Sequence, residues 1–584
     1  MSGRKQWMGV ALALAPLSLA MAQVGPNAQE LLRQQERERA LREQQEQSPD
    51  VRLQPRAVGI ERLPAEESPC FPIGSIVFEG EDADTFAWAL EAANPSDDPA
   101  LGRCLGTQGI NVVMKRVQNA IVAKGYVTTR VLAAPQDLTS GTLSLTVIPG
   151  RVRAVRFAAG TDSRATWWNA VPAKPGDLLN LRDIEQALEN FQRIPTVAAD
   201  IQIVPAEGDG VQPGESDLVI SWQQRSPFRF GLTLDDSGSE STGKLQGGAT
   251  LSLDDWWMWN DLFYVNVGHD VFNGEGRGTE SWTAHYDVPV NYWSFGATAS
   301  GYDYRQDVAG PFETYTYAGS SENAELRAAR MLFRNARTKI GAYGTGWLRD
   351  SKNFIDDTEI EVQRRRMAGW ALGLTWKQFI GRAVLDADVG YKRGTGAFGA
   401  LESPEEVGQQ ACIYEQQNPV EGRTPPAQCP LEGTSRPELI TASAQLNVPF
   451  KVGAQQLRYT GAWRAQWNRT PLVPQDRFAI GGRYTVRGFD GELSIAGERG
   501  WTLQNTFALS LGGGQELYLG LDYGHVGGPS TRWQFGDELA GGVIGLRGGF
   551  GRGYWDVFFG APIYQPDGFQ TAYTTLGFSL GWQY

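Results

Sequence analysis

The sequence predicts a transmembrane β-barrel of about 16 antiparallel strands, preceded by two small α+β domains and an N-terminal helix. Three observations predict this fold class. The chain begins with a secretory signal, it carries two consecutive units with one element order, and residues 226–584 alternate between apolar and polar positions. Its 70 glycines, 19 tryptophans and 19 tyrosines fit strands, turns and aromatic girdles better than a helical enzyme.

Residues 1–22 have the layout of a secretory signal peptide. Arg4 and Lys5 precede an apolar run from Trp7 to Ala22, which ends in the small-x-small sequence Ala-Met-Ala. A membrane anchor is the alternative, but the run is shorter than the ~20 apolar residues that a spanning helix needs. No second apolar run of that length follows, so a membrane location would require a barrel, which also satisfies every backbone group in lipid.

Charge and motifs exclude several function classes. The net charge of −13 becomes −15 once the two basic residues of the signal leave (−13 − 2), whereas a nucleic-acid partner requires a basic surface. The stretch from Gly238 to Leu245 imitates a phosphate-binding loop, but leucine stands where Ser or Thr would reach magnesium. This stretch joins two alternating strands, so we expect a hairpin turn. The sequence shows no other catalytic motif, and we expect neither enzyme activity nor a cofactor.

The four cysteines form two local pairs, Cys70/Cys104 and Cys412/Cys429. In an exported protein such pairs indicate disulfides. A zinc site is the alternative, but the chain has no Cys-x-x-Cys and its three histidines are scattered. We therefore expect two disulfides and no metal.

Residues 23–48 predict a polar helix, followed by a linker. The stretch from Asn27 to Gln47 combines strong helix formers with opposite charges three or four residues apart. Its apolar residues are too few for a core face, and a helix that is polar all round needs wet surroundings. It is either a solvated, partly disordered arm or a helix lying in a polar lumen. Residues 49–69 contain four prolines and no periodicity, which indicates an extended linker. The charged residues of the helix include Glu30, Arg33, Arg37 and Arg42.

Residues 70–149 and 150–225 each predict the element order β-α-α-β-β. The main helices are Ile110–Lys124 in the first unit and Leu181–Ile194 in the second, because apolar residues recur there at helical spacing. We also expect a short helix over Ala165–Ala170. Two consecutive units with one element order indicate an internal repeat of about 75 residues.

From residue 226 to residue 584 the apolar period changes to two. Phe228, Phe230 and Leu232 alternate with polar or small residues, and the last nine residues do the same. Charged and glycine residues on the second face indicate a wet lumen, which is typical of a transmembrane barrel. A soluble sandwich would also alternate, but the signal peptide and the aromatic outer face disfavour it. Length gives about 14–18 strands, and we expect an even number, 16. Residues 397–437 break the pattern and predict a surface loop stapled by Cys412 and Cys429.

One arginine in the barrel region requires an acidic partner. Arg487 stands among glycines in a segment long enough to fold into the lumen, where a charge held away from water is costly unless paired. Asp522 shares strand parity with Gly520 and Gly524 and therefore points into the lumen, and the glycines leave room for another backbone. We expect these two residues to pair. The alternative is a surface-loop arginine and a solvated pore aspartate.

The same residues carry a family resemblance. Val486-Arg487-Gly488-Phe489-Asp490 resembles the lumenal-loop motif of the outer-membrane POTRA-and-barrel superfamily, and Asp522 with Gly524 resembles the barrel-wall motif that receives the arginine. Cys70–Ile73 and Gly176–Glu185 are similar to segments of the first and second POTRA domains of two-partner secretion transporters. The chain thus resembles the filamentous-haemagglutinin transporter type over essentially its whole mature length.

The resemblance implies a 16-stranded barrel in the bacterial outer membrane, with POTRA domains at 70–149 and 150–225 in the periplasm and a plug helix within 23–48. It implies export of one large partner protein, an adhesin, haemolysin or contact-dependent toxin, which arrives unfolded and engages the POTRA domains. It also implies contact with outer-membrane lipid, function as a monomer and no nucleic acid. An outer-membrane protein insertase of the same superfamily is the alternative. A passive porin would not explain two tandem soluble domains.

Overall fold

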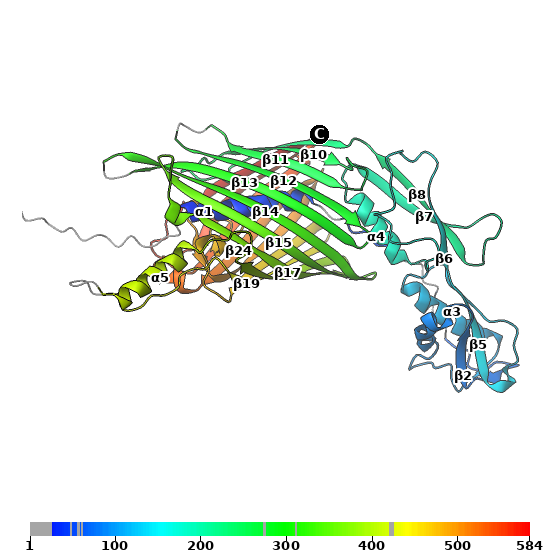
Figure 1. Ribbon diagram of the computed structural model, residues 1–584. Coiled ribbons are helices and arrows are strands. Elements are labelled where there is room, and N and C mark those ends of the chain that lie inside the picture. Colours follow the sequence, from blue (N-terminus) through cyan, green and yellow to red (C-terminus); the bar gives the residue numbers. More distant parts are fainter. Residues whose placement is uncertain are drawn as a thin grey trace, which may run out of the picture.

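The computed structural model describes residues 26–46, 49–54, 59, 62–272, 276–309, 312–419 and 426–584. The expected signal peptide, residues 1–22, lies outside the described residues. No helix in these ranges is both long enough and apolar enough to cross a membrane. Two small domains lie at one end of a long barrel, and a helix lies inside the barrel (Figure 1). The end that carries the small domains is called the domain end below.

The barrel is closed and antiparallel, which confirms the predicted fold class. Seventeen strands join its wall, but β16 (Thr358–Glu359) is only a two-residue extension of the hairpin between β15 and β17, so 16 strands form the barrel. These strands are β9 (Phe228–Asp235), β10 (Gln246–Asp254), β11 (Leu262–Asp270), β12 (Gly278–Val290), β13 (Trp293–Ala309), β14 (Thr314–Arg334), β15 (Thr338–Ile355), β17 (Arg365–Ile380), β18 (Ala383–Thr395), β19 (Glu438–Val452), β20 (Gln455–Asn468), β23 (Arg499–Gly512), β24 (Gln515–Gly527), β25 (Glu538–Phe550), β26 (Gly553–Tyr564) and β27 (Thr575–Gln583).

The period of two separates the two faces of the wall. Outward residues such as Leu232 and Leu521 are large, apolar and exposed, whereas Asp522, one position further, is buried. Between β9 and β10 the segment expected to be a hairpin turn is one, closed by a bridge between Ser239 and Gly243. The phosphate-loop interpretation is therefore excluded.

Five inward aromatic rings lie flat across a glycine of the neighbouring strand. In each pair the two residues are direct cross-strand partners, and a Cβ added at the glycine would come within 2.4 Å of the ring. Only glycine leaves room for a ring in this position. The pairs are Tyr304/Gly319, Tyr343/Gly373, Tyr518/Gly545, Tyr554/Gly581 and Phe558/Gly577.

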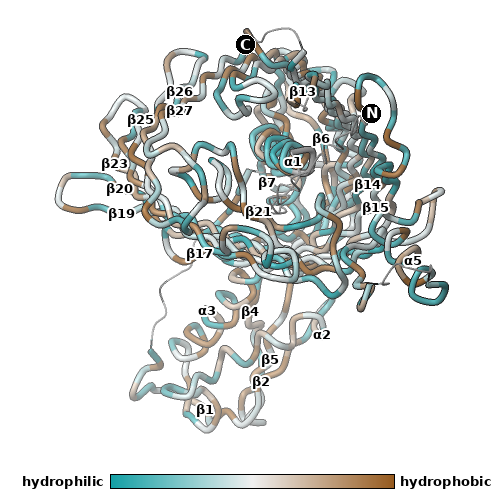
Figure 2. Tube along the Cα trace, turned by 90° about the vertical axis from the view of Figure 1, so that its left-hand side faces the viewer, coloured by the Kyte–Doolittle hydropathy of each residue, from teal (hydrophilic) through white to brown (hydrophobic). Residues whose placement is uncertain are grey.

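Two segments of the described residues lie in the lumen (Figure 2). One is helix α1 (Pro26–Gln45). The other is the lumenal loop, residues 469–498 between β20 and β23, which contains η4 (Pro474–Asp476), β21 (Phe478–Ile480) and β22 (Ile495–Gly497). Loop residues from β21 to β22 pack with Val526, Leu539 and Phe569 into a small apolar cluster. The loop therefore has a core of its own inside the barrel.

The two small domains share one sheet topology. The first comprises β1 (Phe71–Pro72), β2 (Ser75–Glu79), α2 (Ala83–Phe86), η1 (Ala87–Ala93), β3 (Cys104–Leu105), α3 (Thr107–Ala123), β4 (Arg130–Leu132), η2 (Leu138–Ser140) and β5 (Thr142–Ile148). The second comprises β6 (Arg151–Phe157), α4 (Leu181–Gln192), β7 (Val197–Pro205) and β8 (Glu215–Gln224). The sheet orders are β2-β5-β4 and β6-β8-β7, each with one parallel and one antiparallel pairing.

The short helix expected over Ala165–Ala170 is wrong. The segment forms turns, because its polar side chains bond to the barrel instead of supporting a helix. Thr166 donates to the Met258 carbonyl at 2.7 Å, and the Asn169 amide donates to the Trp259 and Pro289 carbonyls. Pro172, close behind, also disfavours helical backbone before it.

Both predicted disulfides are present. Cys70–Cys104 joins the residue before β1 to β3, and Cys412–Cys429 crosslinks the loop between β18 and β19. This loop also contains a helix that the sequence analysis did not predict, α5 (Pro404–Gln417). Its first turn is held by a capping box in which Ser403 and Glu406 bond each other's backbone N–H.

Candidate functional site

The lumen is the candidate site, and polar contacts hold α1 in it. Glu30 is buried and accepts hydrogen bonds from the Tyr302 hydroxyl of β13 and from Arg33 and Arg37. Arg37 also donates to the Tyr302 hydroxyl at 3.3 Å. A buried carboxylate is stable only with such partners, so this cluster fixes the helix against one side of the wall.

Further ion pairs run along the same helix. Arg464 of β20 donates two hydrogen bonds of 2.6 and 2.8 Å to the Glu36 carboxylate, and Arg42 lies 3.4 Å from Glu325 of β14. Arg33 donates to the Gly491 carbonyl of the lumenal loop at 2.7 Å. All four helix residues singled out from the sequence thus contact the wall, the loop or each other. Among the described side chains of α1, the buried apolar ones are Leu31 and Leu32. The helix is therefore held mainly by polar contacts.

The structure brings Arg487 and Asp522 together. The Arg487 Nε and Nη2 atoms donate to the two Asp522 carboxylate oxygens at 2.7 and 2.8 Å, and the Arg487 backbone N–H donates at 2.9 Å. The Asp522 side chain is 1% exposed. Arg487 Nη2 also donates to the Thr506 hydroxyl at 3.0 Å. Three donors on one buried carboxylate make a strong, directional anchor for the loop.

Glycines let the loop approach the wall this closely. A Cβ at Gly524 would lie 2.8 Å from Val486 and 2.9 Å from Ile480. Gly488 has φ +106°, and a Cβ there would lie 2.5 Å from the Ala561 carbonyl oxygen. A side chain at either position would push the loop away from the wall.

The rest of the motif is anchored as well. Phe489 stacks edge-on against Phe569 with ring centroids 5.9 Å apart. The Asp490 carboxylate accepts from the backbone N–H groups of Ala572 and Glu492 at 2.7 and 3.0 Å. The motif therefore ties the loop to β24 and to the segment after β26.

A second loop arginine was missed by the sequence analysis. Arg483 forms an ion pair with Asp236 and lies 3.6 Å from Asp235, at the end of β9. Its position in the same glycine-rich segment could have indicated a lumenal arginine. Its partner could not be chosen, because several inward-facing carboxylates are expected at a similar height in the barrel. Tyr302 and Arg464 were missed because strand parity shows which residues face inward and not which helix residue they meet.

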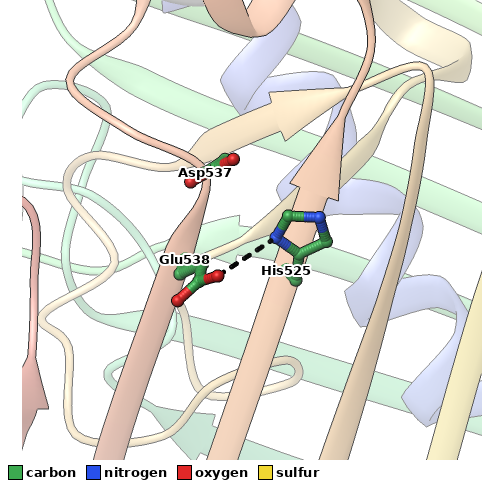
Figure 3. A group of neighbouring side chains, drawn as sticks. All are labelled: His525, Asp537 and Glu538. Carbon is green, nitrogen blue, oxygen red and sulfur yellow. Dashed lines mark ion pairs between the residues drawn. The ribbon is translucent and has the colours of Figure 1, made fainter.

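One group of side chains could hold a metal by geometry alone (Figure 3). In the described part of the chain, potential ligand atoms of His525, Asp537 and Glu538 lie within 4.8 Å of one another. His525 and Glu538 are cross-strand partners, and His525 Nδ1 lies 3.7 Å from Glu538 Oε1. Both side chains are well exposed to solvent. An exposed ion pair explains their proximity, and we assign no metal.

Comparison with known proteins agrees with this geometry. The family of "haemolysin secretion/activation protein ShlB/FhaC/HecB" matches residues 214–548. A ShlB-type POTRA domain matches residues 71–150, and a second POTRA domain matches residues 151–205.

Three individual proteins illustrate the similarity. The chain is 34% identical to the outer membrane transporter CdiB-2 of Burkholderia pseudomallei, over 94% of this chain and 93% of the relative. It is 23% identical to the hemolysin transporter protein ShlB of Serratia marcescens, over 79% and 76%. The solved structure of CdiB from Acinetobacter baumannii matches with a TM-score of 0.80 at 30% identity, over 96% of this chain and 99% of that one.

Proposed function

The chain belongs to the ShlB/FhaC/HecB family of outer-membrane transporters, and from this premise we propose that it exports one large unfolded partner protein to the cell surface. Members of this family are transporters and not enzymes, and their POTRA domains lie in the periplasm. The domain end of the barrel is thus the periplasmic end. The proposed partner is an adhesin, a haemolysin or a contact-dependent toxin.

The observation that supports the proposal is a polar lumen that holds a helix bound mainly by polar contacts. Helix α1 contacts the wall through ion pairs such as Glu36–Arg464 and Arg42–Glu325. Leaving the lumen exchanges these contacts for water at modest net cost, because partly exposed ion pairs contribute little. Burial of a large apolar face would instead make the helix a permanent part of the core. We infer that α1 is a plug that leaves when the partner enters.

The POTRA domains offer edges for an extended chain. In the sheet orders β2-β5-β4 and β6-β8-β7, the outer strands β2, β4 and β7 each keep one edge unpaired by another described strand, whereas the outer edge of β6 already bonds to residues 176–178. An unfolded polypeptide gains main-chain hydrogen bonds by adding to such an edge, and neighbouring apolar side chains give selectivity. Leu132 of β4 and Val77 of β2 are exposed apolar residues on these edge strands.

The anchored loop has a separate proposed role. The Arg487–Asp522 pair would hold the lumenal loop against the wall, so that it shapes the channel while the plug moves. The apolar outer face of the barrel would contact outer-membrane lipid, and one chain would be enough, because its lumen is complete within one barrel. With no nucleotide in the periplasm, folding of the partner outside the cell would supply direction.

Co-expression with the product of a large neighbouring secreted gene tests the proposal. We expect the partner in the culture medium only when this chain is present. The matched control is the chain carrying Arg364→Ala, which removes an exposed loop ion pair with Glu359 and should export normally. Export that does not depend on this chain, together with depletion of many outer-membrane proteins in its absence, would support the insertase alternative instead.

A further inference from the structure

The linker between α1 and the first POTRA domain makes an unusual set of contacts. Residues 50–53, called the strap below, run between α4 of the second POTRA domain and the periplasmic ends of β14, β15 and β17. The sequence of residues 49–69 predicts only an extended linker. The strap is extended, but it is held at almost every residue.

Carboxylates and arginines hold the backbone of the strap. The Val51 and Leu53 N–H groups donate to Glu189 Oε1 and Glu185 Oε1 at 3.0 and 2.8 Å. Arg334 and Arg182 donate to the carbonyls of the same two residues, each at 3.4 Å. Every second residue of the strap is thus hydrogen-bonded through both its N–H and its carbonyl group, as an extended peptide is in a binding groove.

Side chains add alternating contacts. Val51 and Leu53 pack against the apolar core of the second POTRA domain. On the other side, Asp50 accepts from Lys339 and Lys377 at 2.8 and 2.9 Å, and the Arg52 guanidinium lies 4.1 Å from the centre of the Phe379 ring. The period of two separates a face toward the domain from a face toward the barrel.

The groups beneath the strap form a buried ion network. The side chains of Glu185, Arg334 and Lys339 are 1%, 3% and 9% exposed. Arg334 pairs with Glu185 and Glu189 at 3.3 and 3.0 Å, and Lys339 pairs with Glu189 at 2.6 Å. The two glutamates lose a backbone donor each when the strap leaves, so the network favours the attached state.

The strap limits how far the plug can travel. Helix α1 has 20 residues and is therefore about 30 Å long. Five residue steps separate Gln45 from Asp50, a reach of at most about 18 Å. Because Asp50 is bound at the periplasmic mouth, a helix sliding along the barrel axis would keep about 12 Å, or two turns, inside the lumen.

We propose that the strap is the latch of the plug, and that α1 leaves the lumen only after residues 50–53 detach from α4 and the barrel rim. This inference rests on the proposed plug function and adds the element that controls it. Opening therefore has two steps, release of the strap and exit of the helix. A partner that displaces the strap from the second POTRA domain would open the channel without touching the helix.

Crosslinking tests the latch with one shared position. The four native cysteines are all in disulfides, so new thiols are unique. In Asp50→Cys/Lys377→Cys, a short cleavable thiol crosslinker fixes the strap to β17. The matched control is Lys377→Cys/Asp386→Cys, which joins cross-strand partners of β17 and β18 that form an ion pair at 3.0 Å.

The readout is single-channel conductance in planar bilayers. We expect crosslinking to abolish full-conductance openings in the strap variant. In the control variant, which also lacks the Lys377–Asp50 pair, crosslinking should leave the opening frequency as it was before crosslinking. Before crosslinking, Asp50→Cys/Lys377→Cys should open roughly tenfold more often than the native chain, because the ion pairs of Asp50 are lost. The same two substitutions thus act in opposite directions, which a folding defect would not produce.

Deleting residues 26–45 distinguishes a failure of the latch from a failure of the plug. In the crosslinked strap variant this deletion should give constant high conductance, because no plug remains to be held. Unchanged conductance after deletion would refute the plug itself. High conductance after deletion, combined with equal opening of the two crosslinked variants that keep the helix, would refute the latch and leave the plug intact.

Discussion

Breaking the pair between Arg487 and Asp522 should release the lumenal loop from the wall. Either single substitution to alanine leaves a buried charge without its partner, which costs about 3–5 kcal/mol. In the docked loop this energy opposes only docking, because the barrel strands stay paired. The undocked population should then rise between roughly one hundred and several thousand times.

The double variant Arg487→Ala/Asp522→Ala should cost much less than the sum of the single changes. It removes hydrogen bonds but strands no charge, and replacing both partners of a buried pair is close to neutral. The coupling energy between the two positions should therefore be at least as large as one single effect, about 3–5 kcal/mol. This coupling separates a specific pair from two residues that matter independently.

Thiol labelling in purified protein measures the undocked population. A cysteine at Thr485, which is buried in the docked loop, reacts with a maleimide only when the loop opens. The control is Arg364→Ala, in an exposed pair with Glu359, which should not change the labelling rate. If the double variant labels at the product of the two single effects, the coupling is below about 0.5 kcal/mol and the reasoning is refuted.

Three further predictions concern other parts of the chain. Replacing Cys412 and Cys429 by serine should destabilise the surface loop by about 2–3 kcal/mol; proteolysis on intact cells should cut α5 faster, and an unchanged rate would contradict this. Burial alone would raise the pKa of Glu406, but hydrogen bonds to its carboxylate outweigh burial and lower the pKa to about 2, so its stabilisation is complete above pH 4.5 and is lost as the pH falls toward 2. Loop proteolysis should accelerate over that range, and Glu406→Gln should flatten the profile. Asn169→Ala should loosen the joint between the second POTRA domain and the barrel by about 2–3 kcal/mol, because two barrel carbonyls lose a buried donor; unchanged hydrogen exchange in the turn at residues 255–261 would argue against it.

Strand periodicity made the barrel predictable. Each wall strand meets lipid on one side and a polar lumen on the other, so the two faces appear directly in the sequence. The same parity placed Asp522 inward and suggested its pairing with Arg487. A buried charge in a lumen has few candidate partners, which is why this contact could be inferred over a separation of 35 residues.

Contacts between uncharged or irregular segments could not be predicted in this way. Asn169 and Asn260 bond to each other at 2.9 Å across the joint between domain and barrel, but amides carry no charge rule that pairs them. The alternation within the strap covers only four residues of a segment that otherwise has no periodicity, and its partners come from α4, β14, β15 and β17. The capping-box residues Ser403 and Glu406 predict the start of helix α5. The prolines around them favour a loop, so the helix was not expected.

The glycines that lie beneath flat aromatic rings affect the width of the channel. At pairs such as Tyr343/Gly373 and Phe558/Gly577, a ring that projected from the wall into the lumen would narrow the channel. Lying flat, each ring presents its face to a cation of the chain itself: Arg327 lies 3.9 Å from the centre of the Tyr343 ring and Arg483 lies 5.2 Å from the centre of the Phe558 ring. The glycines thus keep the bore wide and let these rings hold arginines close to the wall. This part of the wall therefore contributes an open bore to the transporter, and not selectivity.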